Sequence, residues 1–308
     1  MRFELEGNNG KYVWNSEGLF QPKAKFASTY LGTNEKTGSK VVVKRFFQAQ
    51  EKSEIEIHRI KREAELHVKY PDLFGSAELL EQGGNYYLIR EFFEGIDIKS
   101  PQFHKVATQK IDSRFWIKIG IALCEQLELL HSKGIYHCDV KPSNIIVEFE
   151  GSNPKVRLID FGSAFESGMN YKVPFSFVYS PPELVLGLNE LIGSATDLYA
   201  LAIVLYEKIT GRPHIFNQNA GILIQLQLTQ DLKADNKLRP EVYEMLKKAT
   251  NKGMIAKPPS MYKREEIAEI VEEGIQGRYL TAGELKIDLA EMLNLPAEGL
   301  LKRLKRLI

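Results

Sequence analysis

The chain has 308 residues, of which 44% are hydrophobic and 26% are charged, and its formal net charge is +1. This composition is ordinary for a soluble globular protein, and the nearly neutral charge gives no reason to expect a nucleic-acid partner. No apolar run reaches the about 18 residues of a membrane span, and the N-terminus has no apolar signal segment. We therefore expect neither a membrane span nor secretion.

Cysteine usage is consistent with that expectation. The two cysteines, Cys124 and Cys138, provide neither a disulfide framework nor the spacing of a metal site. Such usage suits a reducing compartment, so we expect a cytoplasmic protein.

The first third of the chain predicts mainly strands. Two β-rich runs, FASTYLG (26–32) and KVVVKRF (40–46), flank a turn-rich linker and predict a hairpin. A second hairpin is expected to turn at Gly83-Gly84. Between the hairpins, Ser53 and Glu56 have the spacing of a capping box and predict the start of a helix. Pro71 should stop that helix, because proline disfavours helix at the residue before it.

From Asp112 onward the pattern becomes helical. Residues 114–134 form a long apolar-periodic segment, with Gly134 as the expected C-cap. Two short strands are expected around a turn within 145–160. Residues 196–211 are apolar nearly all round, which predicts a buried helix. The chain should therefore divide into a β-rich N-terminal lobe, 1–94, and a mainly helical C-terminal lobe, 95–308.

The motifs with chemical meaning follow one another in the second lobe. His137-Cys138-Asp139 precedes Lys141 and Asn144, and Asp160-Phe161-Gly162 comes shortly after. This succession resembles the protein kinase family, in its eukaryotic-like Ser/Thr branch, and the resemblance covers roughly 12–294. It implies a bilobal α+β protein kinase fold and an ATP-dependent enzyme that phosphorylates protein hydroxyl groups.

The resemblance assigns a role to each residue of these motifs. Asp139 would orient the substrate hydroxyl and accept its proton, and Lys141 would neutralise charge on the transferring phosphoryl group. Asn144 and Asp160 would hold Mg²⁺, which prefers hard oxygen donors.

The resemblance also identifies a nucleotide-binding lysine. Lys44 matches the residue that holds the α and β phosphates, and its helical partner should be a glutamate. We assign Glu63, because it shares a helical face with Ile60 and Ala64; Glu56, on nearly the same face, is the alternative.

The adenine pocket is expected between the segment that connects the two lobes and the sheet of the first lobe. The resemblance implies that Phe93 would supply backbone contacts to adenine, that Glu91 also belongs to the ATP site, and that Thr29 and Val42 would lie over the ring. Arg90 falls just before the connecting segment, where the family usually has an apolar or small residue. A charged head there needs a partner, and Glu63 and Asp160 are the candidates.

The phosphate loop departs from the family. Pro22, Ala24 and Ala27 replace its glycines. Alanine keeps its N–H, whereas proline loses it and fixes φ. The donors at the tip, which are Lys25, Phe26 and Ala27, remain, so we expect weakened or altered ATP binding and retained catalysis.

Three further matches concern the large lobe. Glu183 and Arg278 resemble a buried structural pair, and Asp197 resembles the aspartate that braces the catalytic loop through backbone amides. Asp197 also suits the N-terminal turn of a helix. Ser176 aligns with the hydroxyl residue that faces the catalytic aspartate in Ser/Thr kinases; an ordinary loop serine is the alternative.

Cys138 stands where the family most often has an arginine that binds a phosphate on the activation loop. Cysteine cannot make that contact, so we expect activity that does not require phosphorylation there, although Ser163, Ser167 and Tyr171 remain modifiable. A small packed residue is favoured over a reactive thiol.

The sequence is also compatible with two other functions. One is a pseudokinase scaffold, and the other is an enzyme of this fold that phosphorylates a small molecule or transfers AMP. The basic C-terminal segment 298–308 favours a final packing helix, with a membrane surface or a partner as the alternative. Partners should be ATP, Mg²⁺ and a protein substrate, with autophosphorylation also considered.

Overall fold

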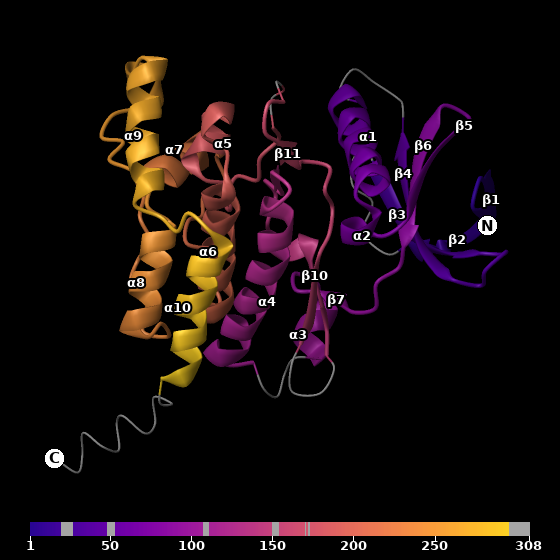
Figure 1. Cartoon of the computed structure of the whole chain (residues 1–308), viewed down its shortest axis with the longest axis horizontal. Helices are drawn as coiled ribbons and strands as arrows, with labels where there is room; N and C mark the ends of the chain where they lie inside the picture. The colour runs from indigo at the N-terminus through magenta and orange to yellow at the C-terminus, as the bar shows by residue number, and fades with distance from the viewer. Residues whose placement is uncertain are drawn as a thin grey trace, which may run out of the picture. The chain divides into compact units, whose positions relative to one another are not determined.

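A computed structural model describes residues 1–19, 27–47, 53–106, 111–149, 154–169, 171 and 173–295 (Figure 1). The chain forms two compact units: unit 1 comprises 1–94 with 160–164, and unit 2 comprises 95–159 with 165–308. The division expected from the sequence ran once, between 94 and 95. The short segment 160–164 lies with unit 1 instead: Asp160 contacts Lys44 and Arg59, and the carbonyl oxygen of Ala164 accepts a hydrogen bond from Arg62. The basic segment 298–308 lies outside the described residues.

Unit 1 is an antiparallel sheet with two helices. Within the described residues the sheet has six strands in the order β1-β2-β3-β4-β6-β5. The strands are β1 (Arg2–Gly7), β2 (Gly10–Leu19), β3 (Ala27–Asn34), β4 (Lys40–Phe47), β5 (Ala77–Gln82) and β6 (Asn85–Glu91). The helices are α1 (Ser53–Lys69) and α2 (Pro71–Phe74).

Both hairpins predicted for this unit are present. Strands β3 and β4 pair with Thr29 opposite Lys44, and β5 and β6 pair across the turn at Gly83-Gly84. Helix α1 ends at Lys69, immediately before Tyr70 and Pro71, as expected from the restriction that proline places on the preceding residue. The cap proposed at Ser53 falls outside the described side chains.

The two faces of the sheet carry different apolar clusters. On one face, aromatic residues including Trp14 and Tyr30 pack with Val43 and Ile89. On the other, Phe46 and Leu88 pack against Ile60 and Ala64 of α1. Because successive residues of a strand point to opposite faces, each of β4 and β6 serves both clusters.

Glu78 links the strands at the two edges of the sheet. Its carboxylate, on β5, accepts the hydroxyl of Tyr12 at 2.8 Å and the backbone N–H of Asn8 at 2.5 Å, in the turn between β1 and β2. The sheet is therefore curled, so that its first hairpin reaches its last strand. The sequence analysis did not single out β1 or β2.

Unit 2 is mainly helical, with short strands beside its catalytic motifs. In this unit, β10-β9-β7 form one sheet and β11-β8 another. The strands are β7 (Ile96–Asp97), β8 (Ile135–Tyr136), β9 (Ile145–Glu148), β10 (Lys155–Leu158) and β11 (Phe165–Glu166). The helices are α3 (Pro101–Val106), α4 (Ser113–His131), α5 (Pro182–Val185), α6 (Ser194–Thr210), α7 (Ala220–Thr229), α8 (Pro240–Ala249), α9 (Arg264–Gln276) and α10 (Ala282–Asn294).

The centre of unit 2 is helix α6. It is buried continuously from Ala195 to Tyr206 and packs between α4 and α8, which agrees with its uniformly apolar sequence (Figure 1). Helix α4 begins after Asp112, whose carboxylate accepts the N–H of Phe115 at 2.9 Å. Its C-cap is Ser132 and not Gly134; the glycine takes a φ of 69° two residues further on, where the chain turns into β8.

No described helix is long and apolar enough to cross a membrane.

Candidate active site

Lys44 lies on the face of β4 that α1 covers. Its Nζ is 3.1 Å from Oδ1 of Asp160 and 3.4 Å from Oε2 of Glu63, whose side chain is 1% exposed. Burial opposes a positive charge on Lys44, but the carboxylates of Asp160 and Glu63 outweigh that cost and raise its pKa above the ordinary lysine value. The amine is therefore a stable cation at neutral pH.

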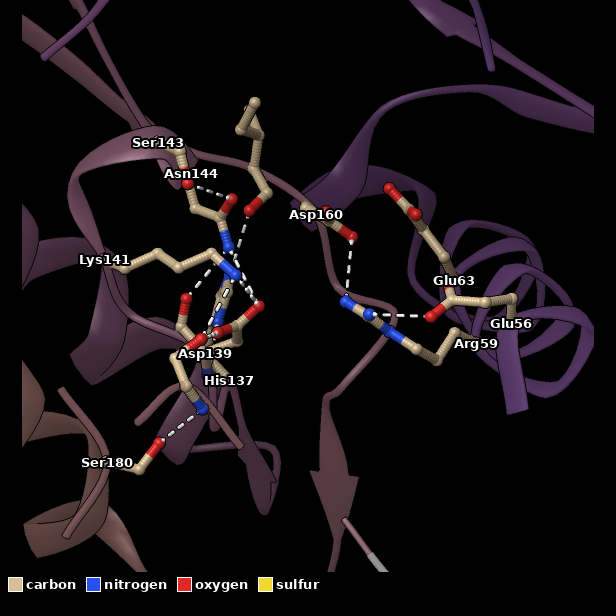
Figure 2. A network of polar contacts seen from close by, with 12 residues as sticks. Glu56, Arg59, Glu63, His137, Asp139, Lys141, Ser143, Asn144, Asp160 and Ser180 are labelled. Atoms are coloured by element: carbon tan, nitrogen blue, oxygen red, sulfur yellow. Dashed lines mark hydrogen bonds and ion pairs between the residues drawn. The ribbon is translucent and has the colours of Figure 1, made fainter. Parts of the chain in front are cut away.

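The structure distinguishes the two glutamates proposed for Lys44. The pair forms with Glu63, whereas Glu56 contacts Arg59, with Oε1 of Glu56 3.5 Å from Nη1 of the arginine. Arg59 also lies beside Asp160, with Nη2 of Arg59 4.0 Å from Oδ1 (Figure 2). The sequence analysis missed Arg59, although its position one helical turn before Glu63 places it on the same face of α1.

In unit 2, Asp139 is surrounded by hydrogen-bond donors. The Ser176 hydroxyl donates to Oδ1 of Asp139 at 2.6 Å, and Nζ of Lys141 donates to Oδ2 at 2.7 Å. Lys141 also reaches the Ser176 oxygen at 3.3 Å. The Asn144 amide donates to the backbone oxygen of Asp139 at 2.9 Å (Figure 2). The structure thus brings together Ser176, Lys141 and Asn144, the three residues that the sequence placed near the catalytic aspartate.

Asp197 fixes the backbone that carries Asp139. Its two carboxylate oxygens accept the backbone N–H groups of His137 and Cys138, each at 2.8 Å. His131 contributes a third contact, with Nε2 2.9 Å from Oδ2. Burial disfavours the charge of Asp197, but the hydrogen bond and charge of His131, with further help from His137, outweigh it and lower the pKa. Because Asp197 lies in the first turn of α6, both interpretations of this residue apply together.

His137 adds a second support for the same loop. The backbone N–H of Asp139 donates to Nδ1 at 3.2 Å, and Nε2 lies 3.1 Å from the carbonyl oxygen of Ile159. This pattern requires the neutral tautomer that carries its proton on Nε2, because Nδ1 must accept. The imidazole therefore joins the catalytic loop to the strand end that leads into Asp160.

Both motifs contain a strained backbone position. Among the described residues, the non-glycine residues with positive φ are Cys138, at 60°, and Asp160, at 66°. This region costs an ordinary residue about 1–2 kcal/mol. Such strain persists only where surrounding contacts hold it, as the amide contacts of Asp197 do for Cys138.

Cys138 belongs to an apolar cluster and not to a polar site. It is buried with Phe165, Val173, Leu184 and Ile192, and partly buried aromatic residues of the same segment pack against them. Burial raises the pKa of its thiol well above the ordinary value. The thiol is therefore a packed side chain, at the position where the family most often has a phosphate-binding arginine.

Glu183 and Arg278 form a buried ion pair. The guanidinium nitrogens lie 2.8 and 3.2 Å from the two carboxylate oxygens, and both side chains are fully buried. Thr196 also donates to Glu183 at 3.0 Å, so the carboxylate is fully satisfied. The pair joins α5 to the segment before α10 and is a structural element.

The predicted phosphate loop is described only at its end. Lys25 and Phe26 lie outside the described residues, and Ala27 begins β3. Thr29 is opposite Lys44, and Val42 is opposite Arg90, so all four occupy one face of the sheet.

The residues expected to contact adenine follow β6. Glu91 ends that strand, and its carboxylate accepts the Ser76 hydroxyl at 2.9 Å. Phe93 lies two residues beyond the strand. Their backbone contacts to adenine stay a prediction.

The donors proposed for Mg²⁺ have suitable chemistry. The amide nitrogen of Asn144 donates to the backbone oxygen and to Oδ2 of Asp139, which fixes the side chain, and its amide oxygen accepts the Ser143 hydroxyl at 3.4 Å. The Asp160 carboxylate is partly exposed. Both are hard oxygen donors. Within the described residues, no group of three or more His, Cys, Asp or Glu side chains is arranged to hold a metal ion.

Unit 1 has a curled sheet with a helix-paired lysine, and unit 2 has an aspartate among hydroxyl and amine donors. Each unit by itself has the features of the protein kinase class. The family model described as "Protein kinase domain" matches residues 23–272, and the chain belongs to this family.

Curated relatives of this chain are also named as protein kinases. The chain is 26% identical to the probable serine/threonine-protein kinase PknB of Lactococcus lactis over 89% of its own length and 41% of the relative's. It is 27% identical to Aurora/IPL1-related protein kinase 2 of Caenorhabditis elegans over 66% of each chain. It is 26% identical to CBL-interacting serine/threonine-protein kinase 20 of Arabidopsis thaliana over 79% of its length and 55% of the relative's. The chain thus spans about two thirds or less of these relatives.

Proposed function

We propose that the protein is a serine/threonine protein kinase that transfers the γ-phosphoryl group of ATP to a protein hydroxyl. The observation that carries the proposal is the contact of Ser176 with Asp139. A serine hydroxyl donates to the carboxylate at 2.6 Å, with the amine of Lys141 3.3 Å from the same oxygen. An alcohol is therefore accommodated where a substrate hydroxyl would have to lie.

The contacts of this loop suggest how a substrate hydroxyl would react. Asp139 would accept the hydrogen bond of the attacking hydroxyl, orient its oxygen and take up the proton. Lys141, a cation bonded to the same carboxylate, would stabilise negative charge on the transferring group. Because phosphoryl transfer depends mainly on position and charge, this pre-formed arrangement supplies much of what the reaction needs.

On the nucleotide side, Lys44 would contact the phosphates while Glu63 and Asp160 hold its amine. Asn144 and Asp160 would hold Mg²⁺, which would screen phosphate charge when bound. The identity of the metal, the role of the glycine-free loop and the adenine contacts are parts of the same proposal.

A single experiment tests this function against its alternatives. The protein is incubated with Mg²⁺, ATP and a generic protein substrate, and both proteins are analysed by intact mass. Lys44→Met and Asp160→Ala serve as matched controls with strongly reduced transfer. Addition of phosphate to the substrate supports the proposal, whereas addition of AMP would show nucleotidyl transfer. The absence of both transfer and nucleotide binding in the unaltered chain would leave a scaffold role.

The cellular setting is also a proposal. Cys124 and Cys138 are both free and buried, which supports a reducing, cytoplasmic location. Fractionation of cells that express the natural protein would test it. The substrate would be a protein with an accessible serine or threonine, and autophosphorylation would appear in the intact-mass experiment as phosphate on the chain itself.

A further inference from the structure

Arg90 is a half-buried arginine whose inner nitrogen, Nε, has lost contact with water. Its Nε is inaccessible to solvent and has no hydrogen-bond partner within the described part of the chain. A buried donor left unsatisfied costs about 1–3 kcal/mol, so an arginine at this position requires a reason.

Helix α1 carries a buried acceptor that also lacks a partner, on Glu63. Oε1 of Glu63 is the one buried carboxylate oxygen without a hydrogen bond among the described residues, while Oε2 faces Lys44 at 3.4 Å. Of the two carboxylates around Lys44, Glu63 is the more distant and also the more buried. A carboxylate held through only one oxygen can still rotate about its terminal torsion.

Arg90 lies on the correct face to reach that oxygen. In the register of the sheet it is opposite Val42 on one side and Ala77 on the other. Val42 shares its face with Lys44, and Ala77 packs against the cluster that contains Ile60 of α1. Arg90 therefore projects toward α1, as Lys44 does.

His67 lies four residues after Glu63 on α1, and it is buried with Nδ1 3.0 Å from the carbonyl oxygen of Gly75. Burial lowers its pKa, against the hydrogen bond to Gly75 and the charge of Glu63, which raise it; the charge of Arg90 lowers it further. The charges of Glu63 and Arg90 therefore act on the same buried side chain.

The other acids in this part of unit 1 are already engaged. Asp160 contacts Lys44 and Arg59, and Glu91, on the opposite face of β6, accepts the Ser76 hydroxyl. Glu63 is the acceptor that remains for Arg90.

We propose that Arg90 is a positioning residue that donates to Oε1 of Glu63 and thereby holds Oε2 toward Lys44. A carboxylate accepts on both oxygens at once, so the arginine supports the Lys44 contact and does not compete with it. Arg90 then sets the orientation of the phosphate-binding amine from the far side of Glu63. The consequence for nucleotide affinity rests on the proposed function, but the pairing itself does not.

The pairing is tested by a double-mutant cycle on the full chain. Unfolding in denaturant is measured for the unaltered protein, Arg90→Met, Glu63→Gln and the double variant. We expect the double variant to lose clearly less stability than the sum of the single losses, because the second substitution removes a group that has already lost its partner. Arg45→Met is the matched control. Arg45 follows Lys44 on β4, so its side chain lies on the other face of the sheet. The stability lost in Arg45→Met should therefore add to the stability lost in Glu63→Gln.

The positioning role is tested by nucleotide kinetics. Arg90→Met should raise KM for ATP by about tenfold, the size expected when one buried polar group loses its partner, with a smaller change in kcat. Arg90→Lys keeps a donor and should recover part of the affinity. It also provides a folded variant if Arg90→Met proves unstable.

The two failures are distinguishable. Additive stability losses in the cycle would overturn the pairing, and a lower KM in Arg90→Met would show that the arginine only obstructs the pocket. Coupling in the cycle, together with no transfer by any form of the protein, would instead overturn the proposed function and leave the pairing intact.

Discussion

The Lys44 contacts of unit 1 and the catalytic loop of unit 2 are built in different ways. In unit 2, backbone amides hold the catalytic loop: Asp197 binds those of His137 and Cys138, and Asp139 is hydrogen-bonded on both carboxylate oxygens. In unit 1, Lys44 is held by ion pairs between long side chains, at 3.1 and 3.4 Å.

The two kinds of contact should respond differently to ligand binding and to substitution. Hydrogen bonds from the backbone fix a loop at the level of its main chain, so the catalytic loop should keep its geometry whatever is bound. Ion pairs between flexible side chains depend on the balance of nearby charges. We therefore expect the catalytic loop to respond to substitution in an all-or-none manner and the Lys44 site to respond by degrees.

The largest effect should come from Asp139. Asp139→Asn removes the base while keeping the shape of the side chain, so kcat should fall about 10²–10⁴-fold. Phosphate incorporation measured by intact mass checks the rate, and the unfolding midpoint should change little. Ser176→Ala is the control within the same cluster and should lose less than about tenfold. An Asp139→Asn enzyme with nearly full activity would contradict the assigned role.

Substitutions around Lys44 should show graded losses. Lys44→Met removes the cation and should lower kcat/KM for ATP about 100-fold, as the loss of a charged transition-state contact does. Glu63→Gln should cost only about tenfold, because Asp160 still holds the amine at 3.1 Å. Steady-state kinetics at varied ATP separates the two. Equal losses of kcat/KM in Lys44→Met and Glu63→Gln would show that the Lys44 contacts are coupled as rigidly as those of the catalytic loop.

Acid should weaken the support of the catalytic loop. The pKa of Asp197 is lowered in the folded protein, so its contribution to stability is complete above the unfolded value of about 3.9 and is lost as pH falls through the lower folded value. The stability difference between the unaltered protein and Asp197→Asn should therefore shrink below about pH 4. Denaturant unfolding at several pH values measures it. A difference that stays constant would mean that Asp197 acts only through its shape.

The smallest effect should follow dephosphorylation. The segment around Cys138 is anchored by apolar packing with Phe165, Val173 and Leu184. Treatment with a phosphatase should therefore change activity less than about twofold, since Cys138 stands in the position where the family most often has a phosphate-binding arginine. Replacing Ser163, Ser167 and Tyr171 together by Ala, Ala and Phe provides the matched variant. Loss of activity in a folded triple variant would show that phosphorylation does order this segment.

The sequence anticipated the elements whose signals are local. The hairpins at 26–46 and 77–91 follow from β-rich runs that flank turn residues, and the end of α1 follows from Pro71. The first hairpin, β1–β2, was not predicted, although its strands pair locally from Arg2 opposite Asn15 to Gly7 opposite Gly10. Its contact with the distant Glu78 could not be seen in the local pattern.

Assignments that depend on long-range contacts were less complete. Helical periodicity favoured Glu63 over Glu56 but gave no sign of Arg59, whose contact with Asp160 joins residues about a hundred positions apart. The inclusion of 160–164 in unit 1 likewise depends on such contacts.

The sequence by itself determined which chemical groups are available and in what order: Lys44, Glu63, Asp139, Lys141, Asn144 and Asp160. Only the tertiary structure decided which of them meet, which amides Asp197 holds, and that Glu63 and Arg90 each retain a buried atom without a partner among the described residues. The physical reason is that local patterns act over a few residues, whereas burial and hydrogen-bond satisfaction are properties of groups brought together from distant parts of the chain.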